Sequence, residues 1–426
     1  MRMSKIGYAI TQKLNSMASA GMMGGAELIN RSTRIVASIA LAWSMGIVEF
    51  GIAAAALVIH DIIRLMIQNG LGARIVVAND DELAETTTAV HRLNWFIGFA
   101  MAALQCALAW PVAVHFGEPQ LAYAIAAMAV VHIVYPAAMV QVYLAQRAQR
   151  WKMMSGTIAA QCATDNLLTA VLALIGFGLW SVVIPKLIVA PLWVLWHRHS
   201  TSWKSTAVPT AETYRSLAGF GIQIFASEAL SGLRHHADKL LVGAILGPVA
   251  LGIYAFAANL ARVSLMSLGN AMGAVILPRL RESMERGRLL ECYRRSIVEM
   301  LAVIGPIAAS IAVVAPWLIP LCFGEKWAPA VPVVVIIALA TISHPIFVAT
   351  SQMLRAQKRA GIELKISMIS ALSFLVCFSI GLGVSIELAA LLAGFAQCVV
   401  AVAVFIAMQP RKDFDPKQAF PQGAAS

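Results

Sequence analysis

The sequence predicts an all-α protein that crosses a membrane about twelve times, with its helices in two pseudo-symmetric six-helix bundles around a central cavity. The first observation is composition: 60% of the 426 residues are hydrophobic and only 12% are charged, whereas charged residues make up about 25% of a soluble domain. The second is the regular recurrence of long apolar runs, and the third is an internal repeat. The gaps between the runs are too short to hold a soluble domain, so we expect a multi-pass membrane protein.

Apolar runs of about 20 residues match the length that a helix needs to cross a ~30 Å hydrocarbon core. Their limits carry an uncertainty of about two to four residues. Several breaks between them carry turn residues, such as Gly117 with Pro119 and Gly247 with Pro248. The predicted helices are 16–43, 48–70, 93–114, 120–144, 156–176, 179–196, 216–243, 249–275, 296–320, 329–350, 362–382 and 386–408.

The distribution of Lys and Arg predicts the orientation. With the N-terminus inside, the inner segments hold 24 of the 32 cationic residues, and the outer loops hold one, Lys326. Such a bias places both termini in the cytoplasm. It also accounts for the net charge of +11, since these cations face anionic headgroups. They are split among seven short segments without interleaved aromatic residues, so we expect no nucleic-acid partner.

These spans divide the chain into five parts. We expect a cytoplasmic N-terminal segment, a first six-helix bundle, a cytoplasmic linker, a second six-helix bundle and a cytoplasmic tail whose Pro, Gln, Gly and Ala content is typical of disorder. Their limits are 1–15, 16–197, 198–215, 216–408 and 409–426.

The two bundles repeat each other in sequence. When the chain is shifted by 201 residues, residues 50–75 fall on 251–276, and eight of these 26 positions are identical. Phe116-Gly117-Glu118 corresponds to Phe323-Gly324-Glu325 at a slightly different offset. Because each repeat has an even number of spans, both insert with the same orientation, which is a transporter architecture.

Seven cations lie inside the predicted spans, and six of them fall on the first, second, seventh and eighth helices, which are the equivalent pairs of the two halves. A charge in lipid is costly, so such residues usually face a partner or a wet cavity. Arginine binds phosphate or carboxylate through paired hydrogen bonds. We therefore expect an aqueous cavity that binds an anionic substrate. The predicted cavity residues are Arg31, Arg34, Asp61, Arg64, Arg234, His235, Asp238 and Arg262.

An alternative interpretation is that these charges form ion pairs that hold helices together. We assign that role mainly to Lys186, Lys239 and Glu228. Asp165 and Asn166 are two further polar residues inside a predicted helix, and for them a hydrogen-bonded packing contact is favoured over an ion site. Flexible points are expected at glycines on the corresponding helices of the two halves. These hinge candidates are Gly51, Gly72, Gly252 and Gly273.

No metal site, cofactor or disulfide is expected, because the six cysteines are scattered through apolar runs. Histidine is the side chain whose ordinary charge change suits proton coupling, so His235 and His236 are candidates for it, and both H+ and Na+ are candidate coupling ions. A polymerase or ligase would need catalytic residues in sizeable outer loops. The outer loops of this chain are only a few residues long, so we expect a transporter and not an enzyme.

Short motifs in both halves complete the pattern. In order along the chain they are Glu49-Phe50-Gly51, Gly70-Leu71-Gly72-Ala73, Asp238 with Leu240-Leu241-Val242-Gly243, Leu251-Gly252-Ile253-Tyr254, Phe323-Gly324-Glu325-Lys326-Trp327 and Ala330-Val331. In this order and spacing the chain resembles the polysaccharide transporters, the Wzx-type O-antigen and exopolysaccharide flippases of the multidrug, oligosaccharidyl-lipid and polysaccharide exporter superfamily.

This resemblance implies a bacterial inner-membrane protein that flips undecaprenyl-diphosphate-linked oligosaccharide repeats by alternating access, for lipopolysaccharide, exopolysaccharide or capsule synthesis. It implies that the first, second, seventh and eighth helices line the entrance. The expected partners are the lipid-linked oligosaccharide, membrane lipids and a polysaccharide polymerase or export machinery. Two alternatives stay open: an ion-coupled multidrug or small-molecule exporter, which would favour an acidic, aromatic cavity, and a lipid II-type flippase, which commonly has two further helices.

Overall fold

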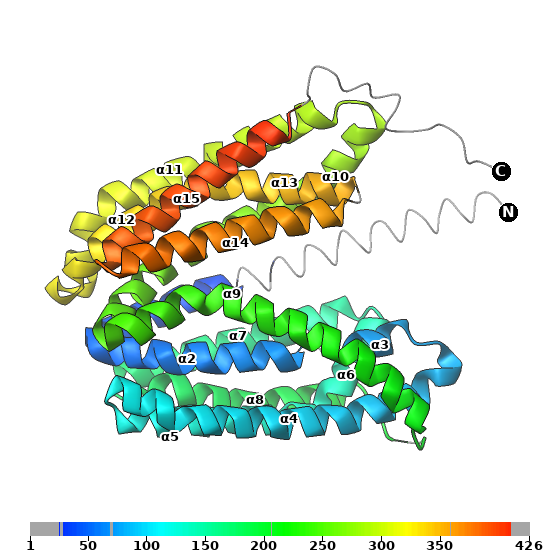
Figure 1. The fold of residues 1–426 in the computed structure, drawn as a ribbon. Helices are drawn as coiled ribbons and strands as arrows, with labels where there is room; N and C mark the ends of the chain where they lie inside the picture. Colours follow the sequence, from blue (N-terminus) through cyan, green and yellow to red (C-terminus); the bar gives the residue numbers. More distant parts are fainter. Residues whose placement is uncertain (1–24, 26–28, 69–70, 206, 358, 410–426) are drawn as a thin grey trace. The chain divides into compact units, whose positions relative to one another are not determined.

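The computed structural model describes residues 25, 29–68, 71–205, 207–357 and 359–409, and the regular elements of this part of the chain are all helical (Figure 1). The prediction of an all-α fold is therefore confirmed. The N-terminal segment 1–15, the beginning of the first predicted helix and the tail from 410 onward lie outside the described residues. The chain forms two compact units, which are described separately below.

The first unit consists of residues 1–256 together with 318–330. Within it α4 packs on α5, α7 on α8, and α5 on both α2 and α8. Its elements are a helix over residues 29–44, α2 (Ile47–Gln68), α3 (Gly72–Val77), α4 (Asp80–Phe116), α5 (Pro119–Val134), α6 (Pro136–Arg147), α7 (Trp151–Leu174), α8 (Trp180–Ser200), α9 (Ala211–Ala257) up to residue 256, the end of α11 and the 3-10 helix Glu325–Ala330.

The second unit consists of residues 257–317 and 331–426. In its described part α14 packs on α15, α10 on α13, and α12 on α15. Its elements are the π-helix Ala258–Val263, α10 (Ser264–Glu285), most of α11 (Leu289–Phe323), α12 (Val331–Ala340), the 3-10 turn Thr341–Ser343, α13 (His344–Ala356), α14 (Ala360–Leu382) and α15 (Ile386–Ala407). The division into two six-helix bundles at 198–215 stays a prediction.

Nine helices in the described residues are long and apolar enough to cross a membrane, and ten if α5 and α6, which meet at 52°, count as one bent span. The two predicted spans not among them are 16–43, whose first residues lie outside the described part, and 216–243, of which only the end belongs to a candidate span, His235–Arg262. The chain is thus a multi-pass membrane protein, and the count of twelve stays a prediction.

The predicted turn at Gly247 and Pro248 is present as a break inside α9. Gly247 has φ 79° and ψ −169°, a conformation that costs a residue with a side chain far more than it costs glycine. Pro248 has no backbone N–H with which to continue the helical ladder. These two residues therefore separate the arm that carries Asp238 from the arm that carries Tyr254.

The glycines predicted as hinges lie where helices approach closely. A Cβ atom on Gly51 would overlap the carbonyl oxygen of Pro248, and one on Gly252 would overlap that of Ile47. Because the two contacts are reciprocal, the backbones of α2 and α9 touch at this point. Gly72 meets the ring of Tyr143 in the first unit, and Gly273 meets Val348 in the second. The glycines thus permit close packing, and their hinge role stays a prediction.

Candidate functional site

Two of the predicted cavity residues form an ion pair on α2, inside the first unit. Arg64 and Asp61 are one helical turn apart, and the guanidinium Nη2 lies 3.3 Å from Asp61 Oδ1. About a third of each side chain is exposed, 35% for Arg64 and 33% for Asp61. At 1.5 Å per residue Asp61 lies about 10 Å before the end of α2. Charges at that depth are costly in lipid, and the solvated cavity that the sequence predicts around them stays a prediction.

A second ion pair joins α7 to α8. The ammonium group of Lys186 lies 3.0 Å from Asp165 Oδ2, and their side chains are 21% and 25% exposed. By helix geometry Asp165 lies about 14 Å before the end of α7 and Lys186 about 9 Å after the start of α8. This pair is therefore also inside the apolar part of the bundle. It agrees with the structural role that the sequence indicates for Lys186.

The two pairs form one group, which we call the ionic cluster: Asp61, Arg64, Asp165 and Lys186. Asp61 interacts electrostatically with Lys186 as well as with Arg64, and Arg64 interacts with Asp165 as well as with Asp61. Two carboxylates and two cations thus alternate across α2, α7 and α8. Sequence reasoning identified the α2 pair as part of the site but did not bring Asp165 and Lys186 to it.

Two buried histidines adjoin the ionic cluster. The rings of His60 on α2 and His132 on α5 stack with centroids 4.9 Å apart, and their side chains are 1% and 0% exposed. Gln105 of α4 donates from Nε2 to the carbonyl oxygen of Ile125, so its Oε1 accepts from His132 Nε2, each at 2.7 Å. Sequence analysis missed these hydrogen-bonded side chains, although a polar residue within a long apolar run could have indicated them.

The predicted residues of α9 differ in how far they are buried. Asp238 is buried, with 2% exposure, and accepts a hydrogen bond of 2.8 Å from the hydroxyl of Tyr254. This bond joins the two arms of α9 across the break at Gly247. His235 is exposed, and the side chain of Arg234 lies outside the described residues. His236 interacts electrostatically with Asp61, which brings α9 to the ionic cluster.

The helix over residues 29–44 places Arg31 half-buried and Arg34 exposed. Between them, Thr33 lies 3.0 Å from the amide nitrogen of Asn166 on α7. Asn166 therefore makes the packing contact that the sequence favours. Glu27, which would share the face of Arg31 and Arg34, lies outside the described residues.

Arg262 belongs to the second unit. It is half-buried in the π-helix Ala258–Val263, and its guanidinium carbon lies 5.6 Å from the centre of the Phe374 ring. A cation over an aromatic face is stabilised by the ring quadrupole. Phe374 could not be predicted as this partner, because the two residues are 112 positions apart in the sequence.

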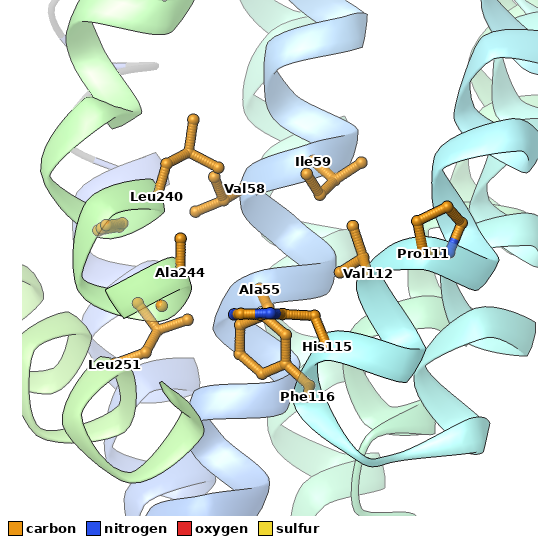
Figure 2. Close-up of a pocket in the computed structure, with 12 residues that line it drawn as sticks. Ala55, Val58, Ile59, Pro111, Val112, His115, Phe116, Leu240, Ala244 and Leu251 are labelled. Atoms are coloured by element: carbon orange, nitrogen blue, oxygen red, sulfur yellow. The ribbon is translucent and has the colours of Figure 1, made fainter. Parts of the chain in front are cut away.

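A separate apolar pocket of about 230 Å³ lies between α2, α4 and α9 (Figure 2). Val58, Val112 and Leu240 face it, and His115 and Phe116 border it at the end of α4. None of the residues that line it belongs to the ionic cluster. Within the described residues no group of three His, Cys, Asp or Glu side chains could hold a metal ion.

Comparison with known proteins identifies the family. Residues 41–332 match the model of a family described as polysaccharide biosynthesis protein. The chain belongs to this family.

Two relatives illustrate this family. The succinoglycan biosynthesis transport protein ExoT of Rhizobium meliloti is 25% identical over 300 residues, which cover 68% of this chain and 59% of that protein. The teichuronic acid biosynthesis protein TuaB of Bacillus subtilis is 20% identical over 300 residues, which cover 70% of this chain and 62% of that protein. The match thus spans about three fifths of the length of these relatives.

Solved structures with the same fold are membrane transporters. The lipid II flippase MurJ in an inward closed conformation aligns with 90% of this chain and 87% of its own, with a TM-score of 0.74 and 12% identity. An inward-facing multidrug resistance MATE family transporter of the MOP superfamily aligns with 88% of this chain and 93% of its own, with a TM-score of 0.64 and 13% identity. This polysaccharide biosynthesis protein therefore has the fold of that superfamily.

Proposed function

We propose that the chain flips a diphosphate-linked oligosaccharide lipid across the bacterial inner membrane, from the cytoplasmic to the outer face, for the synthesis of a surface polysaccharide. The observation that carries this proposal is the ionic cluster: two cations and two carboxylates, partly exposed, inside an apolar bundle. Family membership supports a polysaccharide role, and the fold supports a membrane flippase or exporter.

Physical chemistry links the cluster to such a substrate. A diphosphate group cannot enter hydrocarbon unaided, because an unpaired charge loses its hydration there. Guanidinium and ammonium groups replace that hydration with charge-assisted hydrogen bonds. The lipid chain needs no such help and can stay in the bilayer. The protein has only to offer a charged path for the headgroup and to expose it first to one side and then to the other.

We assign the substrate path to the charged residues of the spanning helices. Arg64 and Asp61 of the ionic cluster are its best-supported members, because their pair is partly open at mid-span. The other predicted contacts are Arg31, Arg34, Arg234, His235, Asp238 and Arg262. Of these, Asp238 fits better as a packing residue, since Tyr254 satisfies its buried carboxylate. The transport step needs no covalent chemistry, so no catalytic residue is assigned.

Two other functions compete with this one. An ion-coupled drug exporter has the same superfamily fold, but a pair of cations in the cavity does not suit a cationic drug. A lipid II-type flippase also has this fold and would carry a diphosphate too. Coupling to H+ or Na+ is compatible with each of the three candidate functions. A polymerase is a proposed partner of the polysaccharide transporter alone.

The experiment replaces Arg31, Arg64 and Arg234 by Ala, one at a time, in cells that depend on this chain for their polysaccharide. We expect less surface polysaccharide and an accumulation of lipid-linked intermediates on the cytoplasmic face at normal protein level. Arg286→Ala is the matched control, because Arg286 is 60% exposed and forms an ion pair with the exposed Glu282 one helical turn away. Normal polysaccharide in all three variants, with no accumulated intermediate, would contradict the proposal.

A further inference from the structure

We propose that Lys186 and Arg64 together form a diphosphate-binding pair, and that Asp165 and Asp61 hold these cations until the substrate displaces the carboxylates. This inference rests on the proposed function and deepens it. It gives Lys186, which the sequence indicates as a structural ion pair, a direct contact with the substrate.

The exposure of the ionic cluster is the first reason. A structural ion pair inside a bundle is expected to be enclosed, because any remaining contact with lipid would be costly. Lys186 and Asp165 instead keep 21% and 25% of their side-chain surface, close to the values for Arg64 and Asp61. Both pairs are therefore accessible in the same way, as expected for groups that line one path.

Unused hydrogen-bonding capacity is the second reason. Arg64 has five N–H donors, and its pair with Asp61 is formed through Nη2. Its buried Nε has no hydrogen-bond partner in the described part of the chain. Asp165 binds Lys186 through Oδ2, and its buried Oδ1 likewise lacks a partner among the described residues. The two ion pairs therefore leave part of their hydrogen-bonding capacity unused. A ligand rich in acceptor atoms can compete with the carboxylates for the cations.

Charge and placement supply the third reason. The four side chains come from α2, α7 and α8, which belong to a single unit. Asp61 interacts with both cations, Arg64 and Lys186. A diphosphate carries several acceptor oxygens on two phosphorus atoms and can accept from two cations at once. Two carboxylates that share two cations mimic this arrangement in the absence of substrate.

The same geometry predicts opposite effects for the two members of the second pair. If Lys186 only joined α7 to α8, then loss of either partner would weaken the bundle and any binding that depends on it. If Asp165 is instead a counter-ion that competes with the substrate, then its neutralisation must strengthen diphosphate binding. Neutralisation of Lys186 must weaken that binding. The sign of the change for Asp165 therefore separates a substrate-binding role from a purely structural one.

The test measures binding of farnesyl diphosphate to the purified full-length protein in nanodiscs by calorimetric titration, with farnesol as the uncharged probe. We expect Lys186→Gln to raise the Kd for farnesyl diphosphate roughly tenfold, as for the loss of one charge-assisted hydrogen bond. Asp165→Asn should lower the Kd several-fold. Lys186→Arg should retain binding. The matched control is Lys152→Gln, because Lys152 is exposed at the start of α7.

Three results would overturn the inference in distinguishable ways. Equal weakening by Lys186→Gln and Asp165→Asn, or no change with Lys186→Gln, would return Lys186 to a structural role and leave the proposed function intact. No binding of farnesyl diphosphate by the wild type, or equal binding of farnesol, would contradict the proposed function as well. If inorganic pyrophosphate binds as tightly as farnesyl diphosphate, the site recognises a free diphosphate and not a lipid-linked one.

A folding defect is excluded by the double variant Asp165→Asn with Lys186→Gln. It removes both charges and so leaves no unpaired ion in the bundle. We expect this variant to keep the apparent Tm of the wild type more closely than either single variant and still to bind farnesyl diphosphate weakly. Wild-type affinity in the double variant would contradict a contact between Lys186 and the diphosphate.

Discussion

The ammonium group of Lys326 lies 2.8 Å from the carbonyl oxygen of Met45 and 3.1 Å from that of Trp43. Next to it the indole nitrogen of Trp327 donates to the carbonyl oxygen of Ala42 at 2.8 Å. The last carbonyl groups of a helix lack partners within the helix and carry partial negative charge. Lys326, the single predicted outer-loop cation, therefore caps the end of the helix over residues 29–44.

Removal of this cap is predicted to destabilise the first unit. Lys326→Met should cost about 1 kcal/mol, because a cation at a helix C-terminus contributes an amount of that order at an exposed site. The measurement is the apparent Tm of the purified protein in detergent. Lys326→Arg keeps the charge and should restore most of the loss, and Glu325→Gln is the neighbouring control. An unchanged apparent Tm in Lys326→Met would argue against the cap.

Close packing of α2 on α9 predicts a strong effect at Gly51. A side chain there would overlap the backbone of Pro248, and backbone cannot move aside as a flexible side chain can. Gly51→Val should therefore lower the yield of monodisperse protein and its apparent Tm. Gly305→Ala is the control, since among the described residues no atom outside its own stretch of helix lies within 4 Å of the added methyl, and alanine is favoured in a helix by up to about 1 kcal/mol. Equal behaviour of the two variants would contradict the packing role.

The bond between Tyr254 and Asp238 predicts a stability effect that a substrate contact would not give. Tyr254→Phe leaves the buried carboxylate of Asp238 without its hydroxyl donor, which should cost about 1–3 kcal/mol. Asp238→Asn keeps an acceptor oxygen and should be milder. We expect the apparent Tm to fall in Tyr254→Phe, with transport per folded molecule unchanged. A loss of transport without a loss of stability would instead place Asp238 in the substrate path.

The buried hydrogen bond between Gln105 and His132 predicts that the effects of mutating the two residues on stability are coupled. Gln105→Leu leaves His132 Nε2 without an acceptor in the interior, which should cost about 1–3 kcal/mol. His132→Leu removes the other partner, and the double variant should be less destabilised than the sum of the two. A coupling of about 0.5–3 kcal/mol is typical of contacting residues. Strictly additive losses in apparent Tm would show that the two side chains do not depend on each other.

The sequence was sufficient for the all-α, membrane-spanning fold class because membrane helices have a strong local signal. Apolar length defines a span, and Gly247 with Pro248 marks a break that the structure confirms. The proximity of Asp61 and Arg64 could also be predicted, since residues three apart share a helix face. Each of these inferences uses residues that are close together along the chain.

Contacts between helices were beyond such reasoning. Lys186 meets Asp165 across a hairpin, and Asp238 meets Tyr254 across the break in α9. Which residues meet there depends on the rotation of each helix about its axis, which composition does not determine. For the same reason the sequence did not reveal that the backbones of two helices touch at Gly51, and the hinge role of this residue stays a prediction.

Translocation in a purified system tests most directly whether this chain flips diphosphate-linked lipids. Vesicles containing the protein are loaded with a fluorescent polyprenyl-diphosphate sugar, and a reductant that cannot cross the bilayer quenches the label on the outer leaflet. We predict that quenching reaches the inner-leaflet label with the wild-type protein, and that Arg64→Ala slows this phase to the rate of protein-free vesicles. Quenching confined to the outer leaflet with the wild-type protein would contradict the proposed function.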